Sequence, residues 1–70
     1  MTDKFIGFTI FADDFRHLGY CSKGVRLGFK RYGLSYSNFI SSGIDAVELL
    51  IATDNNEMVL KVVEAAYERR

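Results

Sequence analysis

Hydrophobic and polar positions divide the chain into short segments, and the first of these predicts a β-strand. Residues 5–11 (FIGFTIF) are rich in aromatic and β-branched side chains. Alternate residues of a strand share a face, so Ile6, Phe8 and Ile10 form the expected core side. Residues 47–52 are a second, less regular strand candidate. The first strand is therefore expected to lack a good partner within the chain, and such an edge invites pairing with another chain.

A short helix is predicted next, over residues 12–18. Asp13 and Asp14 fall in its first turn, where negative charge suits the helix dipole. Gly19 follows the last turn and ends the helix.

Residues 22–32 predict a second, amphipathic helix, with Ser22 as its N-cap and Gly33 as its C-terminal stop. Its expected inner face comprises Val25, Phe29 and Tyr32, and its outer face comprises Lys23, Arg26 and Lys30. Gly24 and Gly28 share a face because they are four residues apart. Each is unfavourable in a helix, but together they would let another backbone approach closely.

Two more short helices are predicted from their capping residues. Ser35 caps the helix over residues 36–41, which Gly43 closes. Asp45 caps the helix over residues 46–51.

The last helix is predicted to begin at Thr53 or Asp54 and to run to about Glu68, with Asp54 and Glu57 spaced as in a capping box. Its polar stripe is narrow and consists of Glu57, Lys61, Glu64 and Glu68. The remaining apolar arc is wider than a surface helix needs, so this helix is either central to the fold or shared with a neighbouring chain.

The predicted fold class is mainly α, a compact bundle of four to five short helices with one N-terminal β-strand. Seventy residues suffice for a single domain, residues 1–70, and leave no room for a second. A chain of this length buries only about 60% of its unfolded surface, which argues against a large substrate pocket and against an enzyme.

Charge and cysteine content narrow the range of expected partners and cellular compartments. Nine basic and nine acidic residues give a net charge of zero, whereas nucleic-acid-binding domains are more often clearly basic. Cys21 is the only cysteine and cannot form an internal disulfide. No apolar run reaches the length of a membrane span. We expect a soluble, cytoplasmic protein without membrane contact.

The titratable residues form no recognisable catalytic or metal site. Asp13 and Asp14 are adjacent, so on a helix their side chains point about 100° apart rather than converging. His17 and Cys21 are separated by the Gly19 break, and neither has the further ligands that zinc needs or the base that a nucleophile needs. We predict no catalytic residue, no metal and no cofactor.

Residues 12–34 follow the layout of a helix-turn-helix: a short helix, a glycine-containing turn, an amphipathic basic helix and a Gly-Leu stop. The segment resembles the head of many winged-helix and MerR-like units. That resemblance implies that the second helix would enter the major groove of DNA. The DNA-facing residues would be Lys23, Arg26, Lys30 and Arg31. The alternative interpretation is a small helical fold whose solvated basic face is balanced by acidic residues elsewhere.

The chain as a whole resembles a family of small proteins of tailed bacteriophages and prophages. The resemblance spans residues 19–68 and is carried by five motifs: Gly19-Tyr20-Cys21-x-x-Gly24-x-Arg26, Phe29-x-x-x-Gly33-Leu34, Phe39-x-x-x-Gly43-Ile44-x-Ala46, Leu49-Leu50-x-Ala52-Thr53 and Val62-Val63-Glu64-x-Ala66. Such proteins commonly carry Gly-Asp where this chain has Asp54-Asn55, so the helix cap there is expected to differ. The resemblance implies a small accessory product of a phage genome and carries no catalytic residue.

We therefore expect a non-enzymatic phage protein that acts by protein–protein contact, most concretely a small virion or assembly component at the tail or the head–tail junction. Its partner would be a second copy or another phage protein. The residues expected in that contact, or in the core, are Ile6, Phe8, Ile10, Val59, Val63 and Tyr67. Two alternatives remain: the DNA-binding or regulatory module described above, and an inhibitor of a host protein that uses the same apolar surfaces.

Overall fold

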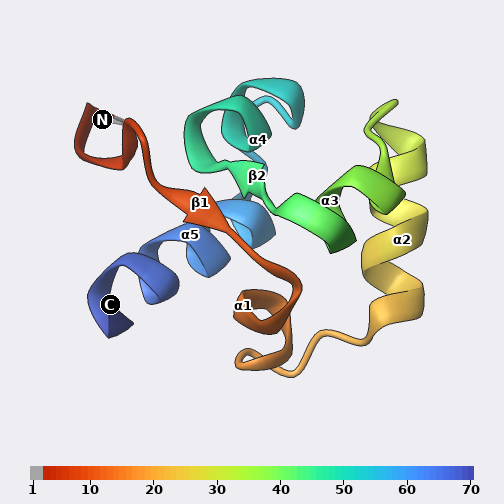
Figure 1. Cartoon of the computed structure of the whole chain (residues 1–70), viewed down its shortest axis with the longest axis horizontal. Helices are drawn as coiled ribbons and strands as arrows, with labels where there is room; N and C mark the ends of the chain where they lie inside the picture. The colour runs from red at the N-terminus through yellow and green to blue at the C-terminus, as the bar shows by residue number, and fades with distance from the viewer. Residues whose placement is uncertain (1–2) are drawn as a thin grey trace.

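Five α-helices dominate residues 3–70, the part of the chain that the computed structural model describes (Figure 1). The elements are η1 (Asp3–Phe5), β1 (Thr9–Ile10), α1 (Ala12–Arg16), α2 (Ser22–Arg31), α3 (Tyr36–Ser42), β2 (Ile44–Asp45), α4 (Ala46–Ala52) and α5 (Glu57–Arg69). The predicted fold class, mainly α with one short N-terminal strand, is confirmed.

The N-terminal strand is much shorter than predicted. Gly7 adopts a positive φ of 77°, and the backbone N–H of Phe8 donates to the carbonyl of Phe5 at 3.0 Å, so a tight turn interrupts residues 5–11. The turn destroys the alternation of faces that a strand would have. As a result Phe5 is buried and Ile6 is 74% exposed, so the prediction that Ile6 lies on the core side was wrong.

The strand is also paired within the chain. Thr9 lies opposite Asp45 and Ile10 opposite Ile44 in an antiparallel ladder. The second strand was missed because it is only two residues long, and the alternative candidate over residues 47–52 is part of α4. The expectation of a strand without an internal partner was therefore wrong, and its edge no longer argues for pairing with another chain.

The helix boundaries follow the local signals in most places. Ser35 and Asp45 cap α3 and α4, each accepting a backbone N–H from three residues on. Gly43 ends α3 with a positive φ, as expected. The cap of α2 lies one residue earlier than predicted: Cys21 Sγ, not Ser22, accepts the N–H of Gly24 at 3.4 Å.

The start of α5 at Glu57 was predicted three to four residues too early. Asp54 and Asn55 both have left-handed backbones, with φ of 54° and 56°, so neither Thr53 nor Asp54 can cap the helix. Asn56 is the cap, and its Oδ1 accepts the N–H groups of Met58 and Val59.

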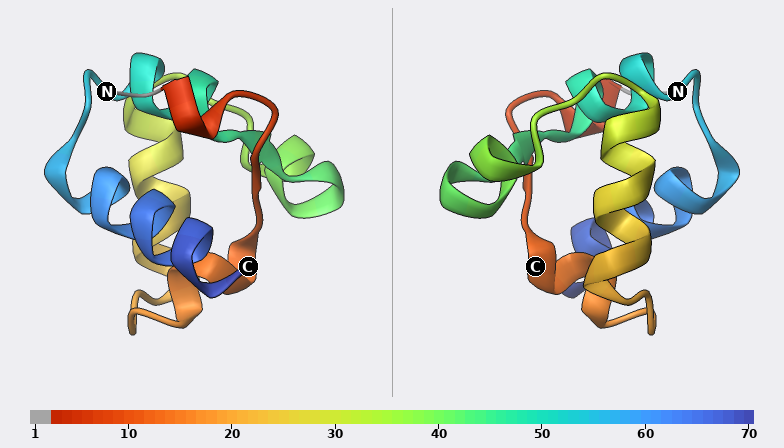
Figure 2. Two further views of the ribbon diagram at one scale, coloured as in Figure 1. Left: turned by 90° about the vertical axis from the view of Figure 1, so that its left-hand side faces the viewer. Right: turned by 90° about the vertical axis from the view of Figure 1, so that its right-hand side faces the viewer.

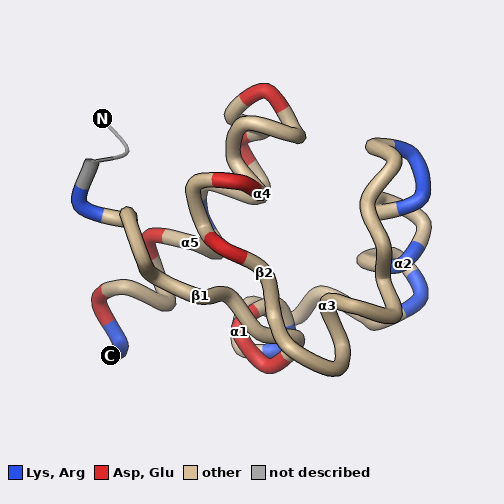
Figure 3. Tube along the Cα trace, turned by 45° about the horizontal axis from the view of Figure 1, so that its top comes forward, with Lys and Arg blue, Asp and Glu red and all other residues tan. Residues whose placement is uncertain are grey.

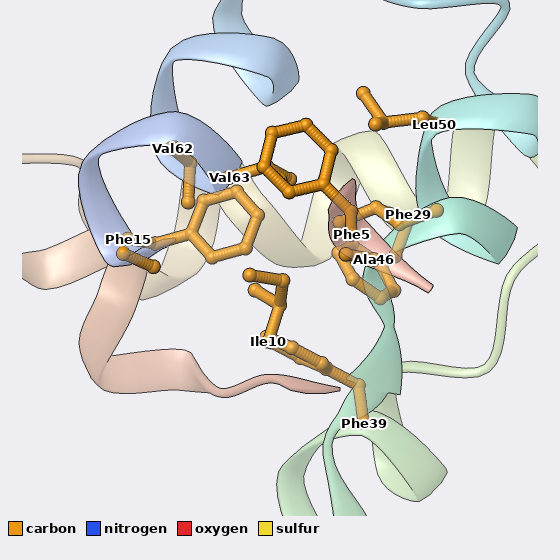
Figure 4. Close-up of a cluster of buried hydrophobic side chains, with 11 residues drawn as sticks. Phe5, Ile10, Phe15, Phe29, Phe39, Ala46, Leu50, Val62 and Val63 are labelled. Atoms are coloured by element: carbon orange, nitrogen blue, oxygen red, sulfur yellow. The ribbon is translucent and has the colours of Figure 1, made fainter. Parts of the chain in front are cut away.

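The core lies where α5 meets α1, α4 and the strand pair. Figure 4 shows Phe5, Ile10, Phe15, Val62 and Val63 converging there from elements far apart in sequence. The other buried apolar residues are Phe29, Phe39, Ala46, Leu49, Leu50 and Ala66. The wide apolar arc of α5 is thus explained by a central position in the fold.

A polar contact fastens α5 to the start of the chain. Asp14 is 2% exposed, accepts the backbone N–H of Phe11 at 2.7 Å and forms ion pairs with Arg69 and Arg70. Arg70 also donates to the carbonyl of Thr9 at 2.7 Å. We call Asp14, Arg69 and Arg70 the Asp14 clasp. Asp14 is therefore a structural residue and does more than complement the dipole of α1.

Candidate functional site: an apolar groove beside a basic helix

A groove of about 390 Å³ lies between α2 and the start of α5. This volume falls within the range of about 300–1,000 Å³ that is typical of small-molecule binding pockets. The groove is lined by Phe15, Gly19, Tyr20, Cys21, Gly24, Val25, Gly28, Phe29, Tyr32, Leu34, Leu49, Thr53, Asn56, Met58 and Val59. We call it the α2–α5 groove. The right-hand view of Figure 2 shows α2 upright in front, with α1 near its lower end and α4 towards its upper end.

The groove has an apolar floor and a partly exposed rim. Phe29 and Leu49 are buried at its base, whereas Cys21, Tyr32 and Met58 are exposed to solvent. Hydrocarbon that enters the groove would exchange water for these walls, at about 25 cal/mol for each Å² buried. The groove is therefore suited to apolar side chains or to another apolar group.

Two glycines of α2 keep the groove open. A Cβ added to Gly28 would meet no atom within 4 Å, and one added to Gly24 would meet only Cys21 Sγ at 3.6 Å. Within the described chain, no backbone makes the close approach that this glycine pair was predicted to allow. The glycines instead border empty space.

Replacing Gly28 by alanine is expected to stabilise the protein. Alanine is favoured over glycine inside a helix by about 1 kcal/mol, and the added methyl group has room. The melting temperature, followed by circular dichroism, should rise by about 4–8 °C. A fall in melting temperature would mean that the groove closes on Gly28 in solution.

A polar pair closes one end of the groove. The side-chain amide of Asn56 donates to the hydroxyl of Tyr32 at 3.2 Å, which links the cap of α5 to the end of α2. Tyr32 was predicted on the inner face of the second helix. It lies at the edge of that face and is exposed to solvent. Asn56 was missed by sequence reasoning because the preceding left-handed residues move the start of α5.

The groove wall carries few groups able to do chemistry. Among the described residues, its titratable side chains are those of Tyr20, Cys21 and Tyr32. The hydroxyl of Thr53 already donates to the carbonyl of Leu49 at 2.8 Å. Within residues 3–70, no carboxylate, histidine or lysine lines the groove.

The outer face of α2 is basic and exposed. Lys23, Arg26, Lys30 and Arg31 recur on one side of the helix, with Leu27, which is 57% exposed, among them. Residues 15–44 contain five cations and no acidic residue. Within residues 3–70, no ion pair involves these four side chains. Figure 3 shows the Lys and Arg positions of α2 along one edge and acidic positions on α1, β2 and α4.

The six residues predicted to form a contact surface or the core separate into three groups. Ile10 and Val63 are fully buried and belong to the core. The rings of Phe8 and Tyr67 pack edge to face beside η1, with 5.5 Å between their centroids. Ile6 projects into solvent. Val59 lines the groove. These residues therefore do not form one continuous surface.

The remaining polar candidates lie outside the groove or on its rim. Asp13 is exposed and pairs with Arg16 at 2.8 Å, while Asp14 is held by its clasp. His17 and Cys21 are both exposed. Among residues 3–70, no three His, Cys, Asp or Glu side chains come together as a metal site would require.

The helix-turn-helix layout is present as an order of elements, α1 followed by α2, but α1 has only five residues.

Comparison with models of protein families gave no match, and comparisons with curated proteins and with solved structures gave no significant similarity. None of the helices in the described part of the chain is long and apolar enough to cross a membrane.

Proposed function

We propose that this chain is a non-enzymatic protein that acts by binding another protein, and that the α2–α5 groove is where it does so. The observation that carries the proposal is an open apolar groove, kept open by Gly24 and Gly28, in a chain of 70 residues. A domain this small has little apolar surface to spare from its core. Apolar walls left open in such a domain are best explained by an apolar partner that covers them.

The composition of the groove supports binding over catalysis. General acid–base chemistry needs a titratable group held against the reacting atoms. The groove offers two phenols and one thiol, and no histidine or carboxylate faces them from its walls.

The setting we propose is a tailed phage or prophage, with the protein as a small virion or assembly component. The support for this is the motif resemblance over residues 19–68. Most motif residues have structural roles here: Phe29, Phe39 and Val62 lie in the core, and Gly43 ends α3. The partner would be another phage protein or a second copy of this chain. In a variant of this proposal, the chain inhibits a host protein by binding it through the same groove.

Site-specific photocross-linking tests the proposal in cells that carry the gene in its native phage or prophage. A benzophenone amino acid at Met58, which lines the groove and is exposed, should cross-link to a discrete protein after irradiation. The same group at Glu64, exposed on α5 outside the groove lining, serves as the control and should not. Cross-links to nucleic acid alone, or equal protein cross-linking from both positions, would refute the proposal.

A second candidate, binding of nucleic acid, is favoured by the unpaired cations of α2. Duplex DNA would contact Lys23, Arg26, Lys30 and Arg31 through its phosphates. Four phosphate contacts predict that log Kobs falls with log[salt] with a slope of about −3.6.

Charge reversal distinguishes the two candidates. If α2 binds DNA, the double variant Lys23→Glu/Arg26→Glu should lose binding in a fluorescence anisotropy titration at low salt, while the exposed Lys61→Glu control should retain it. If neither the wild type nor Lys61→Glu binds a duplex in a salt-dependent manner, the nucleic-acid candidate is wrong.

A further inference from the structure

The position of the cations relative to the groove points to the chemistry of its partner. Gly24, Gly28 and Arg31 recur at i, i+4 and i+7, so Arg31 continues the glycine stripe beyond the groove. Lys23 and Leu27 form the neighbouring row on the solvent side of that stripe. A partner segment that packs on the two glycines therefore contacts the apolar walls of the groove and lies beside positive charge on one side.

The charge argues against a symmetric pair of copies seated on this groove. In a two-fold interface the same patch faces itself, so Lys23 and Arg31 of one copy, which flank the groove, would lie near those of the other. Like charges brought together across an interface cost several kcal/mol.

We infer that the α2–α5 groove receives an amphipathic helix of a partner protein, whose apolar side chains fill the groove and whose acidic residues pair with Lys23 and Arg31. This inference rests on the proposed function and names its partner class. Helix-in-groove recognition uses apolar anchors at i, i+3, i+4 and i+7, and the glycine stripe lets the backbone of such a helix approach α2. Opposite charge on the flank fixes its orientation and speeds its association.

An unbiased selection tests the inference. A displayed library of random 16-residue peptides is selected on the purified full chain and sequenced. The expected enriched peptides combine apolar residues at helical spacing with a net negative charge. Enrichment of basic or uncharged peptides, or enrichment of none, would overturn the inference.

The enriched peptides are then synthesised and their affinities are compared among variants. Gly28→Leu, which fills the groove, and Lys23→Glu/Arg31→Glu should each weaken binding by about tenfold or more. The control Lys61→Glu, on the polar stripe of α5, should change affinity by less than about twofold. If Gly28→Leu binds as well as the wild type, the peptide is not in the groove and the inference fails.

Cys21 supplies a readout that does not depend on a substitution. It is exposed and lines the groove, so a bound peptide should slow its reaction with a thiol reagent such as DTNB. An unchanged reaction rate at saturating peptide would count against the inference even if Gly28→Leu should misfold.

The two proposals can fail separately. Protein cross-links from Met58 together with basic or neutral selected peptides would keep the proposed function and overturn the acidic helix. Binding of duplex DNA that Lys23→Glu/Arg31→Glu abolishes, with no peptide enriched and no protein cross-linked, would overturn both.

Discussion

Replacing Asp14 by alanine is expected to lower the free energy of unfolding by about 3 kcal/mol. Removing one member of a buried ion pair leaves the other without compensation, which typically costs about 3–5 kcal/mol. The lower end applies because Arg69 and Arg70 keep 34% and 36% of their side chains in contact with solvent. The variant also loses the acceptor for the N–H of Phe11 at the start of α1.

The neighbouring acid provides the control for this experiment. Asp13 lies in the same turn, but its side chain is 73% exposed and its partner Arg16 is on the surface. Asp13→Ala should therefore cost less than about 1 kcal/mol, from a surface ion pair and the helix dipole. Urea unfolding followed by circular dichroism measures both. Equal effects of the two variants would show that the Asp14 clasp does not hold α5 in solution.

Gly43→Ala is the second substitution for which we expect a large loss, about 3 kcal/mol. Gly43 has φ 79° and ψ −174°, a region of backbone space that side chains essentially exclude. A Cβ there would lie 2.7 Å from the methyl carbon of Thr9 and 2.8 Å from the ring of Phe11. The Phe11 ring can swing outward, but Thr9 is held by the strand pair, so the backbone must shift.

Gly33→Ala separates the two causes of that loss. Gly33 also has a positive φ, 72°, but an added Cβ would meet nothing within 4 Å. It should therefore show only the backbone cost, about 1–2 kcal/mol. Thermal melts should place Gly43→Ala more than about 10 °C below the wild type, with Gly33→Ala in between. Equal melting temperatures for the two variants would contradict the contact with Thr9.

Local signals determined most of what could be predicted of the fold. Ser35, Asp45 and Gly43 mark helix ends through bonds to residues three or four positions away, and these ends were predicted correctly. Gly19 was predicted to end a helix over residues 12–18, but α1 already ends at Arg16, with His17 as its C-cap. The N-terminal segment failed for a local reason that hydrophobicity does not report. The turn at Gly7 places Phe5 in the core and Ile6 in solvent, whereas Ile10 is buried as predicted.

The candidate site could be predicted only in part. The cations of α2 and the unusual Gly24–Gly28 pair are visible in the sequence, and the two glycines line the groove. The groove itself needs α2 and α5 to be placed relative to each other, which depends on contacts across the whole chain. The Asp14 clasp joins side chains that are separated by 55 and 56 positions in the sequence. The left-handed backbone of Asp54 and Asn55 leaves no clear pattern in the sequence.

The central claim is that the α2–α5 groove is the surface that binds a partner protein. The most direct measurement is a calorimetric titration of the protein captured from Met58 into the wild-type chain and into Gly28→Leu. We expect the variant to melt no lower than the wild type and to bind at least about tenfold more weakly. Unchanged affinity in a folded Gly28→Leu variant would contradict the account.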